Sequence, residues 1–482
     1  MIIPLRPFAP FAPSPVRAFV RSCVPPVPPF ARCFTLSPSL FVKNSAINRE
    51  ILRLAIPNMI SNIVIPLLGM VDTAIAGRFG DDLNIAALSI GATIFNFIFW
   101  NCSFLRMGTS GITAQAYGAD KKKECANMLL RSLWLAFVIA FVIVVFQKPI
   151  GHFSLYVMQG SEQVQTLAAE YLFVRIWAVT ASISLFTLQG WFIGMQDAKT
   201  PMIVAILSVI INIVSSIYFA FNLNMGIAGI AWGSVTGQYF GLVISCILLF
   251  IKYPEYLRLL DVKESLHLGP VVRFLRINRD IFLRTAFVTL VYTFFTAASA
   301  RFGDTILATN ALLMQLFALF SFLCDGFAYA GESLVGRFVG EGNALLLKRF
   351  IRKLMFWSVV IGLFYAIVYV IAWKQILMIF SSSADILDMA GQYIGWVIAV
   401  PLIGSMPFMM DGIMVGATKT KLMRNTAFVA TALFFVCFYL LSPFYENDAL
   451  WISFLVFLSF RGILLYFYSN RLNIKPRDAG IL

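Results

Sequence analysis

Residues 133–146 read LWLAFVIAFVIVVF, a run without a single charged side chain. A strand of a membrane β-barrel alternates apolar and polar residues, so this run excludes such a strand and favours an apolar helix. Comparable runs cover nearly the whole chain of 482 residues, of which 60% are hydrophobic and only 12% are charged. Soluble domains carry about 25% charged residues. The sequence therefore predicts an all-α, polytopic membrane protein rather than a soluble domain with one anchor.

The apolar segments divide into twelve predicted membrane spans at ~20 residues per crossing. Six lie near 51–78, 86–117, 125–147, 163–194, 200–221 and 226–251, and six near 278–301, 307–339, 347–373, 385–416, 420–441 and 448–470. We expect an N-lobe over 46–252, a cytoplasmic linker over 253–277 and a C-lobe over 278–482.

The first 45 residues differ from the rest of the chain. They contain ten of the twenty prolines and no acidic residue. Proline at this density prevents a continuous apolar helix, so neither a signal peptide nor a span fits. We expect residues 1–45 to be a disordered tail, or the product of a start codon placed too far upstream, and we assign the tail no role.

Positive charge predicts the orientation, because Lys and Arg gather in cytoplasmic loops. Alternate loops are rich in them, and these loops contain Lys121, Lys122, Lys123, Lys252, Arg258, Lys263, Arg273, Arg276, Arg279, Lys348, Arg349, Arg352, Lys353, Lys419, Lys421, Arg424, Arg471, Lys475 and Arg477. The intervening loops contain one each, namely Arg78, Lys148, Arg301 and Lys374. Both termini are therefore predicted to be cytoplasmic, in a cell inner membrane.

The second half of the chain repeats the first at an offset of 223 residues. Residues 72–81 read DTAIAGRFGD and residues 295–304 read FTAASARFGD, which agree at six of ten positions. Six helices per copy give both copies the same topology. The prediction is two six-helix lobes related by a parallel pseudo-twofold axis along the membrane normal, an arrangement typical of transporters.

Asp72 is the first candidate for a functional residue, because a charge inside a span usually faces a cavity or a partner. Pro57 and Pro66 precede it in the same span and are expected to bend that helix. A carboxylate on a bent helix that lines a cavity can bind and release a proton. Three polar residues of the fifth and sixth spans are candidate neighbours: Asn212, Ser216 and Ser234. The alternative is a water-exposed Asp at a helix end.

Further charges lie in other spans. Asp325, Glu332 and Asp411 are acids of the second half, and either structural pairing with Arg337, Arg461 or helix ends, or contact with a cationic substrate or second ion, would explain them. Arg106 is interpreted as a structural or gating partner of an unidentified carboxylate, and Arg175 lies near the outer end of the fourth span.

Motifs for other chemistry are missing from the sequence. Seven scattered cysteines form no CxxC pair, and the two histidines, His152 and His267, lie outside the predicted spans. We found no nucleotide-binding P-loop, no GxSxG and no HExxH. We expect neither an enzyme nor a metal or cofactor site. The energy for transport is expected to come from an ion gradient or from a partner protein. The alternative from a different functional class is a membrane-embedded enzyme or a sensor. The sequence lacks the clustered nucleophile, histidine or metal-ligand residues that such an enzyme needs, and its loops are too short for the soluble output domain of a sensor.

Five segments resemble the multidrug and toxic compound extrusion (MATE) transporters, and within them the DNA-damage-inducible protein F branch. They are LAIPNM at 54–59, PLLGMVDTAIAG at 66–77, FLRMGTSGITAQAYG at 104–118, GMQDAKTP at 194–201 and MDGIMVGAT at 410–418. The resemblance covers about residues 48–475 and implies an efflux antiporter that exchanges protons or sodium for an organic, often cationic compound.

The resemblance also assigns roles. Asp72 stands at the family's coupling aspartate, Pro57 at a helix bend that accompanies protonation, and Asn212 and Ser234 at further polar positions of the site. Related members commonly have an aspartate where this chain has Ser216. With one carboxylate fewer, a proton is favoured over sodium as the coupling ion.

The sequence thus predicts a monomeric secondary antiporter that exports small amphipathic, cationic compounds across the lipid bilayer and binds no nucleic acid. Coupling is expected at Asp72, Asn212, Ser216 and Ser234, helix bending at Pro57 and Pro66, and a substrate or second ion site among Asp325, Glu332, Asp411 and Arg106. A flippase or exporter for a lipid-linked compound or metabolite is the alternative function, for which a strongly basic cavity is expected.

Overall fold

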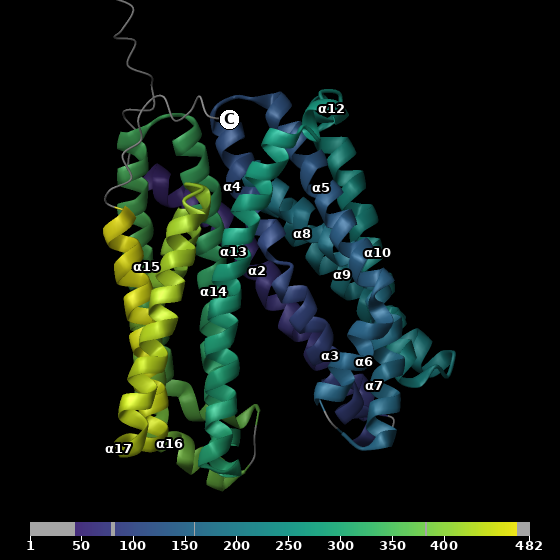
Figure 1. Cartoon of the computed structure of the whole chain (residues 1–482), viewed down its shortest axis with the longest axis vertical. Coiled ribbons are helices and arrows are strands. Elements are labelled where there is room, and N and C mark those ends of the chain that lie inside the picture. Colours follow the sequence, from purple (N-terminus) through teal and green to yellow (C-terminus); the bar gives the residue numbers. More distant parts are fainter. Residues whose placement is uncertain (1–43, 79–81, 159, 381–382, 470–482) are drawn as a thin grey trace, which may run out of the picture. The chain divides into compact units, whose positions relative to one another are not determined.

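The computed structural model describes residues 44–78, 82–158, 160–380 and 383–469, and these residues are almost entirely helical (Figure 1). The predicted tail lies outside them except for its last two residues, which begin α2. The all-α fold predicted from the apolar runs is confirmed.

Nine helices form the first half of the described chain. They are α2 (Asn44–Gly77), α3 (Asp82–Asn101), α4 (Phe104–Gly118), α5 (Lys122–Val145), α6 (Gln147–Met158), α7 (Glu162–Arg175), α8 (Val179–Gly194), α9 (Lys199–Ile217) and α10 (Gly226–Lys252). Two short helices follow, and then five long ones: α11 (Pro254–Leu257), α12 (Val262–Ser265), α13 (Leu268–Ser299), α14 (Asp304–Gly340), α15 (Ala344–Met378), α16 (Ala384–Gly416) and α17 (Thr420–Ser469).

Eleven helical segments of the described residues are long and apolar enough to cross a membrane. The last of them, α17, contains two helices joined at Glu446, whose backbone angles of φ 43° and ψ −117° are not helical. The twelve predicted spans are therefore confirmed. The span boundaries differ most at α13, which begins at Leu268 inside the predicted linker, because its basic first turns are helical although they are too polar to count as a span.

Glycines bring α4 and α14 into close contact, and they do so symmetrically. A Cβ on Gly118 of α4 would overlap the backbone of Arg337, and a Cβ on Gly340 of α14 would overlap the backbone of Gln115. The two glycines are equivalent positions of the sequence repeat, whose offset has drifted from 223 to 222 residues here. An exchange of contacts between equivalent positions is what a twofold axis requires, so the pseudo-twofold arrangement of the lobes has a direct structural counterpart.

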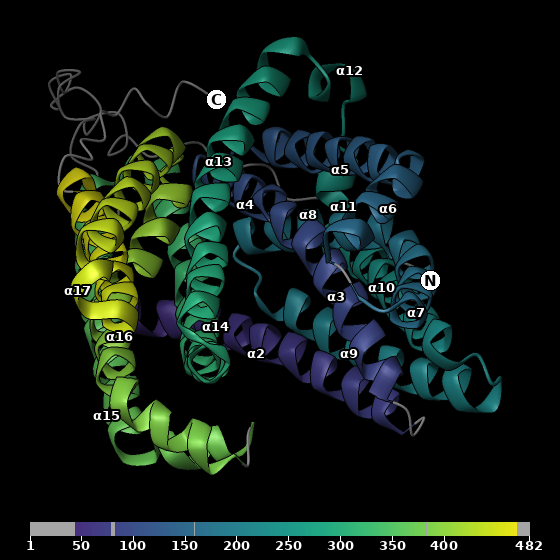
Figure 2. The ribbon, with the colours of Figure 1, turned by 60° about the horizontal axis from the view of Figure 1, so that its bottom comes forward.

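Helix α2 contacts both lobes, with Pro66 between the two contacts. In its first half, Asn62 donates a hydrogen bond to the carbonyl of Phe322 on α14 at 3.1 Å. In its second half, Ile75 and Ala76 belong to the buried apolar core of the N-lobe. Figure 2 shows α2 running from α14 towards α3 and α9. Pro66 lies inside α2 between these two contacts, where it removes one backbone hydrogen bond of the helix.

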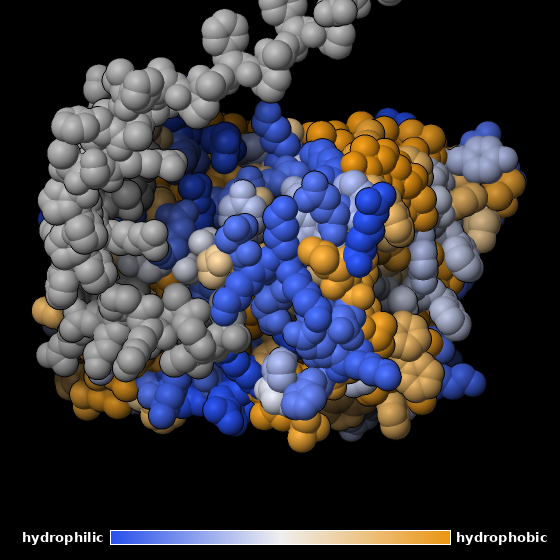
Figure 3. Space-filling model, turned by 90° about the horizontal axis from the view of Figure 1, so that it is seen from above, coloured by the Kyte–Doolittle hydropathy of each residue, from blue (hydrophilic) through white to orange (hydrophobic). Residues whose placement is uncertain are grey.

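The end of the molecule where α4 ends and α13 begins is polar. Seen from that side, hydrophilic residues cover the centre of the face and apolar residues form much of its rim (Figure 3). Lys122 and Lys123 at the start of α5 belong to this end, and both side chains are about half exposed. The charge pattern of the sequence predicts that this face is cytoplasmic.

Candidate functional site

A buried ion pair joins the two lobes at the centre of their contact. Arg106 of α4 donates through Nη1 to Oε2 of Glu332 on α14 at 3.0 Å and through Nη2 to Oε1 at 3.3 Å. Ser110, one turn further along α4, donates its hydroxyl to the same carboxylate at 2.6 Å. The Arg106 and Glu332 side chains are only 6% and 1% exposed. This pair identifies the carboxylate partner that the sequence left unnamed.

Glu332 does not pair with Arg337 or Arg461, which were the partners considered from the sequence. Arg337 instead contacts Glu341, one turn along α14, and Glu50 of α2. The reason is the docking of α14 against α4, which places Glu332 opposite Arg106 and leaves Arg337 at the end of the helix. The prediction for Glu332 therefore missed its partner in the other lobe.

Tyr329 completes this cluster and was not singled out from the sequence. The Arg106 guanidinium lies 3.7 Å from the centroid of the Tyr329 ring. These two residues are equivalent in the repeat, since they are 223 positions apart. Residues next to a twofold axis face their own equivalents. The repeat offset alone could therefore have predicted that Arg106 lies against Tyr329, and hence near Glu332 one turn further on.

Asp72 lies near the C-terminal end of α2, and it is only 8% exposed. Its Oδ1 has no hydrogen-bond partner among the described residues. The opposite charge that acts on it is Arg175, at the end of α7. Arg175 also lies 4.1 Å from the centroid of the Phe95 ring. Asp72 and Arg175 thus both act electrostatically on the buried Tyr171.

The other three predicted coupling residues form a network of their own between α9 and α10. Asn212 donates to the Ser234 hydroxyl at 3.2 Å, and Ser216 donates to the Asn212 side-chain oxygen at 3.0 Å. All three are buried. No hydrogen bond joins this network to Asp72 within the described ranges. The structure therefore brings three of the four residues together and gives Asp72 a different neighbour, Arg175.

The C-lobe contains a second buried cluster of charges. Asp411 of α16 accepts hydrogen bonds on the same oxygen, Oδ2, from Arg284 of α13 and Arg461 of α17. Pairing with Arg461 was one of the alternatives considered from the sequence, whereas Arg284 was not singled out. Asp325 of α14 acts electrostatically on both arginines but forms no hydrogen bond in the part of the chain that the structure describes.

The GMQDAKTP segment connects α8 to α9 at the polar end. Gln196 donates to the carbonyl of Ser333 on α14 at 2.8 Å, which adds a further contact between the lobes. Asp197 accepts from the Thr200 amide at 3.0 Å and caps α9, and it also pairs with Lys252 at 3.1 Å. Burial alone would raise the pKa of Asp197, but the bonds from Thr200 and Lys252 outweigh burial and hold the pKa below its usual value.

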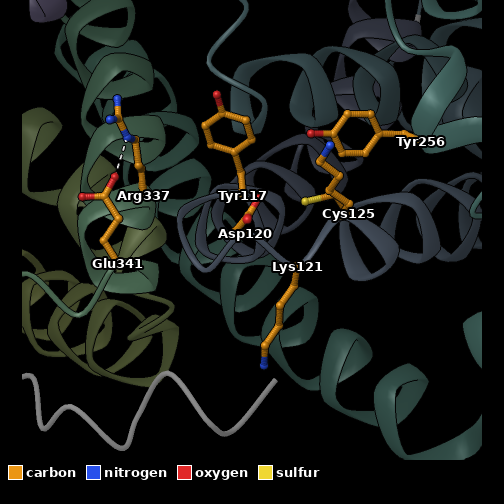
Figure 4. Close-up of a pocket in the computed structure, with 8 residues that line it drawn as sticks. Tyr117, Asp120, Lys121, Cys125, Tyr256, Arg337 and Glu341 are labelled. Carbon is orange, nitrogen blue, oxygen red and sulfur yellow. Dashed lines mark hydrogen bonds and ion pairs between the residues drawn. The ribbon is translucent and has the colours of Figure 1, made fainter. Parts of the chain in front are cut away.

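A cavity of about 390 Å³ lies where the polar ends of the two lobes meet. Tyr117 and Asp120 line it from the end of α4, and Arg337 and Glu341 line it from α14 (Figure 4). Tyr256 of α11 closes another side. None of the predicted site residues lines this cavity. Within the described residues, no three His, Cys, Asp or Glu side chains are grouped closely enough to hold a metal ion.

Comparison with known proteins then decides the family. The model of the MatE family matches the chain twice, over residues 57–218 and 281–441. The chain belongs to the MatE family. The two matches coincide with the two halves of the sequence repeat. DNA damage-inducible protein F of Escherichia coli, a member of the branch that the motifs resembled, is 34% identical over 446 residues, which cover 91% of this chain and 96% of that protein.

Solved MATE structures have the same fold. An outward-facing multidrug resistance MATE family transporter is 20% identical and gives a TM-score of 0.80, with 88% of this chain and 95% of the other covered. A MATE transporter of Vibrio cholerae in its bent form is 16% identical, with a TM-score of 0.78 and coverage of 91% and 98%. This MatE chain is accordingly a multi-pass membrane protein with the two-lobe fold of small-molecule transporters.

Proposed function

We propose that this chain is a secondary antiporter that exports amphipathic organic compounds across the cell inner membrane and is driven by the entry of protons. Export and antiport are what the family resemblance implies. The observation that carries the proposal is Asp72, a buried carboxylate with an unpartnered oxygen on a helix that contacts both lobes. Intramembrane acids of this kind mark proton relays in transporters.

A proton on Asp72 would remove the attraction between its carboxylate and Arg175. The second half of α2 would then lose one of its links to the N-lobe, while the first half stays bonded to α14 through Asn62. Pro66 allows the two halves of α2 to respond separately. In this scheme, protonation of one residue alters the packing of one lobe against the other.

The lobe contact must open and close for alternating access. In the described residues, the hydrogen bonds between the lobes include those of Arg106, Ser110, Gln115 and Gln196, all in the half of the molecule predicted to be cytoplasmic. We therefore propose that this structure corresponds to a state closed to the cytoplasm. The Arg106–Glu332 pair would have to break when the substrate enters from inside.

A proton suits this site better than sodium. Asp72 is the one acid of the predicted coupling set, and its three companions are neutral and bond to each other. A single proton neutralises a lone carboxylate, whereas a sodium ion needs several oxygen atoms around it. The alternative function, a flippase for a lipid-linked compound, called for a strongly basic cavity, but the buried arginines lie in separate places, Arg106 with Glu332 and the two arginines of the C-lobe with Asp411.

Transport in proteoliposomes tests the proposal. We would measure movement of an amphipathic fluorescent dye under an imposed proton gradient and, separately, under a sodium gradient, with the native chain and with Asp72→Asn. Transport driven by protons and abolished in Asp72→Asn supports the proposal. Transport driven by sodium alone, or driven equally well by protons in Asp72→Asn, would overturn it. The matched control is Asp388→Asn, which changes an exposed acid of α16.

A further inference from the structure

Two guanidinium groups in the C-lobe compete for one carboxylate oxygen. Arg284 and Arg461 both donate to Oδ2 of Asp411, and the Asp411 side chain is 7% exposed. An arginine usually pairs with a carboxylate through two parallel bonds that use both oxygens. Here Oδ1 of Asp411 has no partner among the described residues. One carboxylate is therefore shared by two guanidinium groups, and each of them keeps hydrogen-bond donors without a partner.

Unused hydrogen-bond donors remain around this carboxylate. Arg461 has two nitrogen atoms without a partner, Nε and Nη1, and Arg284 has one, Nε. Buried polar groups in proteins are almost always hydrogen-bonded. The cluster offers more donors than acceptors, so it lacks a group rich in acceptor atoms.

Aromatic rings lie near Arg461. The Arg461 guanidinium lies 5.8 Å from the centroid of the Phe408 ring and 5.9 Å from that of Phe457. Phe408 continues into a row of rings through Phe317, which in turn lies 5.6 Å from Tyr292. Charged donors beside a row of aromatic rings match a ligand that has one acidic group and one apolar body.

The two arginines differ in access. The Arg461 side chain is 2% exposed and fixed between rings, whereas the Arg284 side chain is 14% exposed. Arg284 can therefore turn from Asp411 towards an incoming acceptor, while Arg461 keeps Asp411 in place. Asp325 would repel an anionic ligand at this cluster, because its carboxylate acts electrostatically on the same two arginines.

We propose that Arg284 and Arg461 form a binding subsite for the acidic group, a carboxylate or a sulfonate, of an amphipathic substrate, and that Asp411 occupies this subsite when no substrate is bound. The inference rests on the proposed transport function and specifies its substrate class. It replaces the cationic substrate that the family resemblance implied with one that carries a negative charge.

Equilibrium binding to the full chain in phosphatidylcholine nanodiscs tests this subsite. Two fluorescent probes share one dansyl body: dansylglycine, which carries a carboxylate, and dansylamidoethyl-trimethylammonium, which carries a cation. We expect dansylglycine to bind at least tenfold more tightly. Arg284→Gln should remove that preference and Arg284→Lys should restore part of it. Arg301→Gln is the matched control, since Arg301 is an exposed arginine just after α13.

Asp411→Asn and Asp325→Asn provide a test with the opposite sign. Asp411→Asn removes the internal competitor and Asp325→Asn removes the repulsive charge, so each should tighten dansylglycine binding severalfold. The gain from Asp411→Asn should disappear in the double variant with Arg284→Gln. A purely structural or water-filled cluster would instead leave both probes with equal affinity, and that result would overturn the inference.

The binding assay also separates this inference from the proposed function. Asp72→Asn should bind dansylglycine like the native chain, because Asp72 lies in the other lobe, while it loses proton-driven transport. Driven dye transport without any preference for the carboxylate probe contradicts the subsite alone. Preferential binding of dansylglycine without driven transport contradicts the antiport mechanism alone.

Discussion

Arg106 lies face to face with Tyr329, the residue that occupies its own position in the other half of the repeat, at 3.7 Å from the ring centroid. This contact marks the pseudo-twofold axis between the lobes. One turn beyond Tyr329, Glu332 pairs with the same arginine in a buried environment. The centre of the lobe contact is therefore held by a charge pair that belongs to neither lobe alone.

Removing the charge of Glu332 should open the cytoplasmic side. The loss of one partner from a buried ion pair costs about 3–5 kcal/mol, because the other charge remains buried without compensation. In Glu332→Gln, Arg106 can regain water only when the lobes separate. We expect spin labels at positions 123 and 348, placed in a cysteine-free chain, to show a longer distance distribution than in the parent.

Glu341→Gln serves as the control for this experiment. Glu341 also pairs with an arginine of α14, but its side chain is 27% exposed. Exposed pairs contribute about 0–1 kcal/mol, so the distance distribution should stay unchanged. An unchanged distribution in Glu332→Gln as well would show that the Arg106 pair does not hold the lobes together.

Substitution of the glycines where α4 crosses α14 should also open the cytoplasmic side. A methyl group on Gly118 or on Gly340 would overlap the backbone of the opposite helix. Backbone cannot move aside as a flexible side chain can, so Gly118→Ala and Gly340→Ala should each favour the open state and raise thiol labelling of a cysteine at position 121. In Gly395→Ala the new methyl group meets no atom within 4 Å, and labelling should not change.

The fold could be predicted from the sequence to the extent that it depends on local properties. Hydropathy located the spans, because each must bury about twenty residues in lipid. Hydropathy misplaced the start of α13, because its first turns contain Arg273, Arg276 and Arg279 and are helical without being apolar. Helix formation and membrane burial are separate properties, and a hydropathy pattern detects only the second.

The contacts of the candidate site were predicted less completely. The network of Asn212, Ser216 and Ser234 joins neighbouring helices of one lobe, and the sequence suggested these three residues together. Glu332 and Arg106, in contrast, are 226 positions apart, and their meeting depends on how two lobes dock. Arg284 escaped notice because it follows basic residues at the start of α13, where a positive charge is expected near the membrane surface.

Acid should weaken the cap of α9 at the polar end. The pKa of Asp197 is held low by bonds from Thr200 and Lys252 that outweigh its burial, so its charge stabilises the fold at neutral pH. That contribution is lost as pH falls through the lowered pKa, below the usual value of about 4. Asp197→Asn should reduce stability by about 1 kcal/mol at pH 7.

Thermal unfolding of the chain in nanodiscs between pH 7 and pH 3 measures this effect. The melting temperatures of the native chain and of Asp197→Asn should converge towards the acidic end of the range. Asp388→Asn, which alters an exposed acid, should follow the native curve at every pH. A gap between native and Asp197→Asn that stays constant down to pH 3 would contradict a role for the Asp197 charge.

The central claim is that Asp72 carries the coupling proton, and proton movement caused by substrate alone tests it most directly. A pH-sensitive dye trapped in proteoliposomes would record the internal pH when substrate is added without any imposed gradient. We predict a substrate-dependent pH change for the native chain. In Asp72→Asn, exchange of labelled for unlabelled substrate should continue without that change. A pH change of native size in Asp72→Asn would contradict the account.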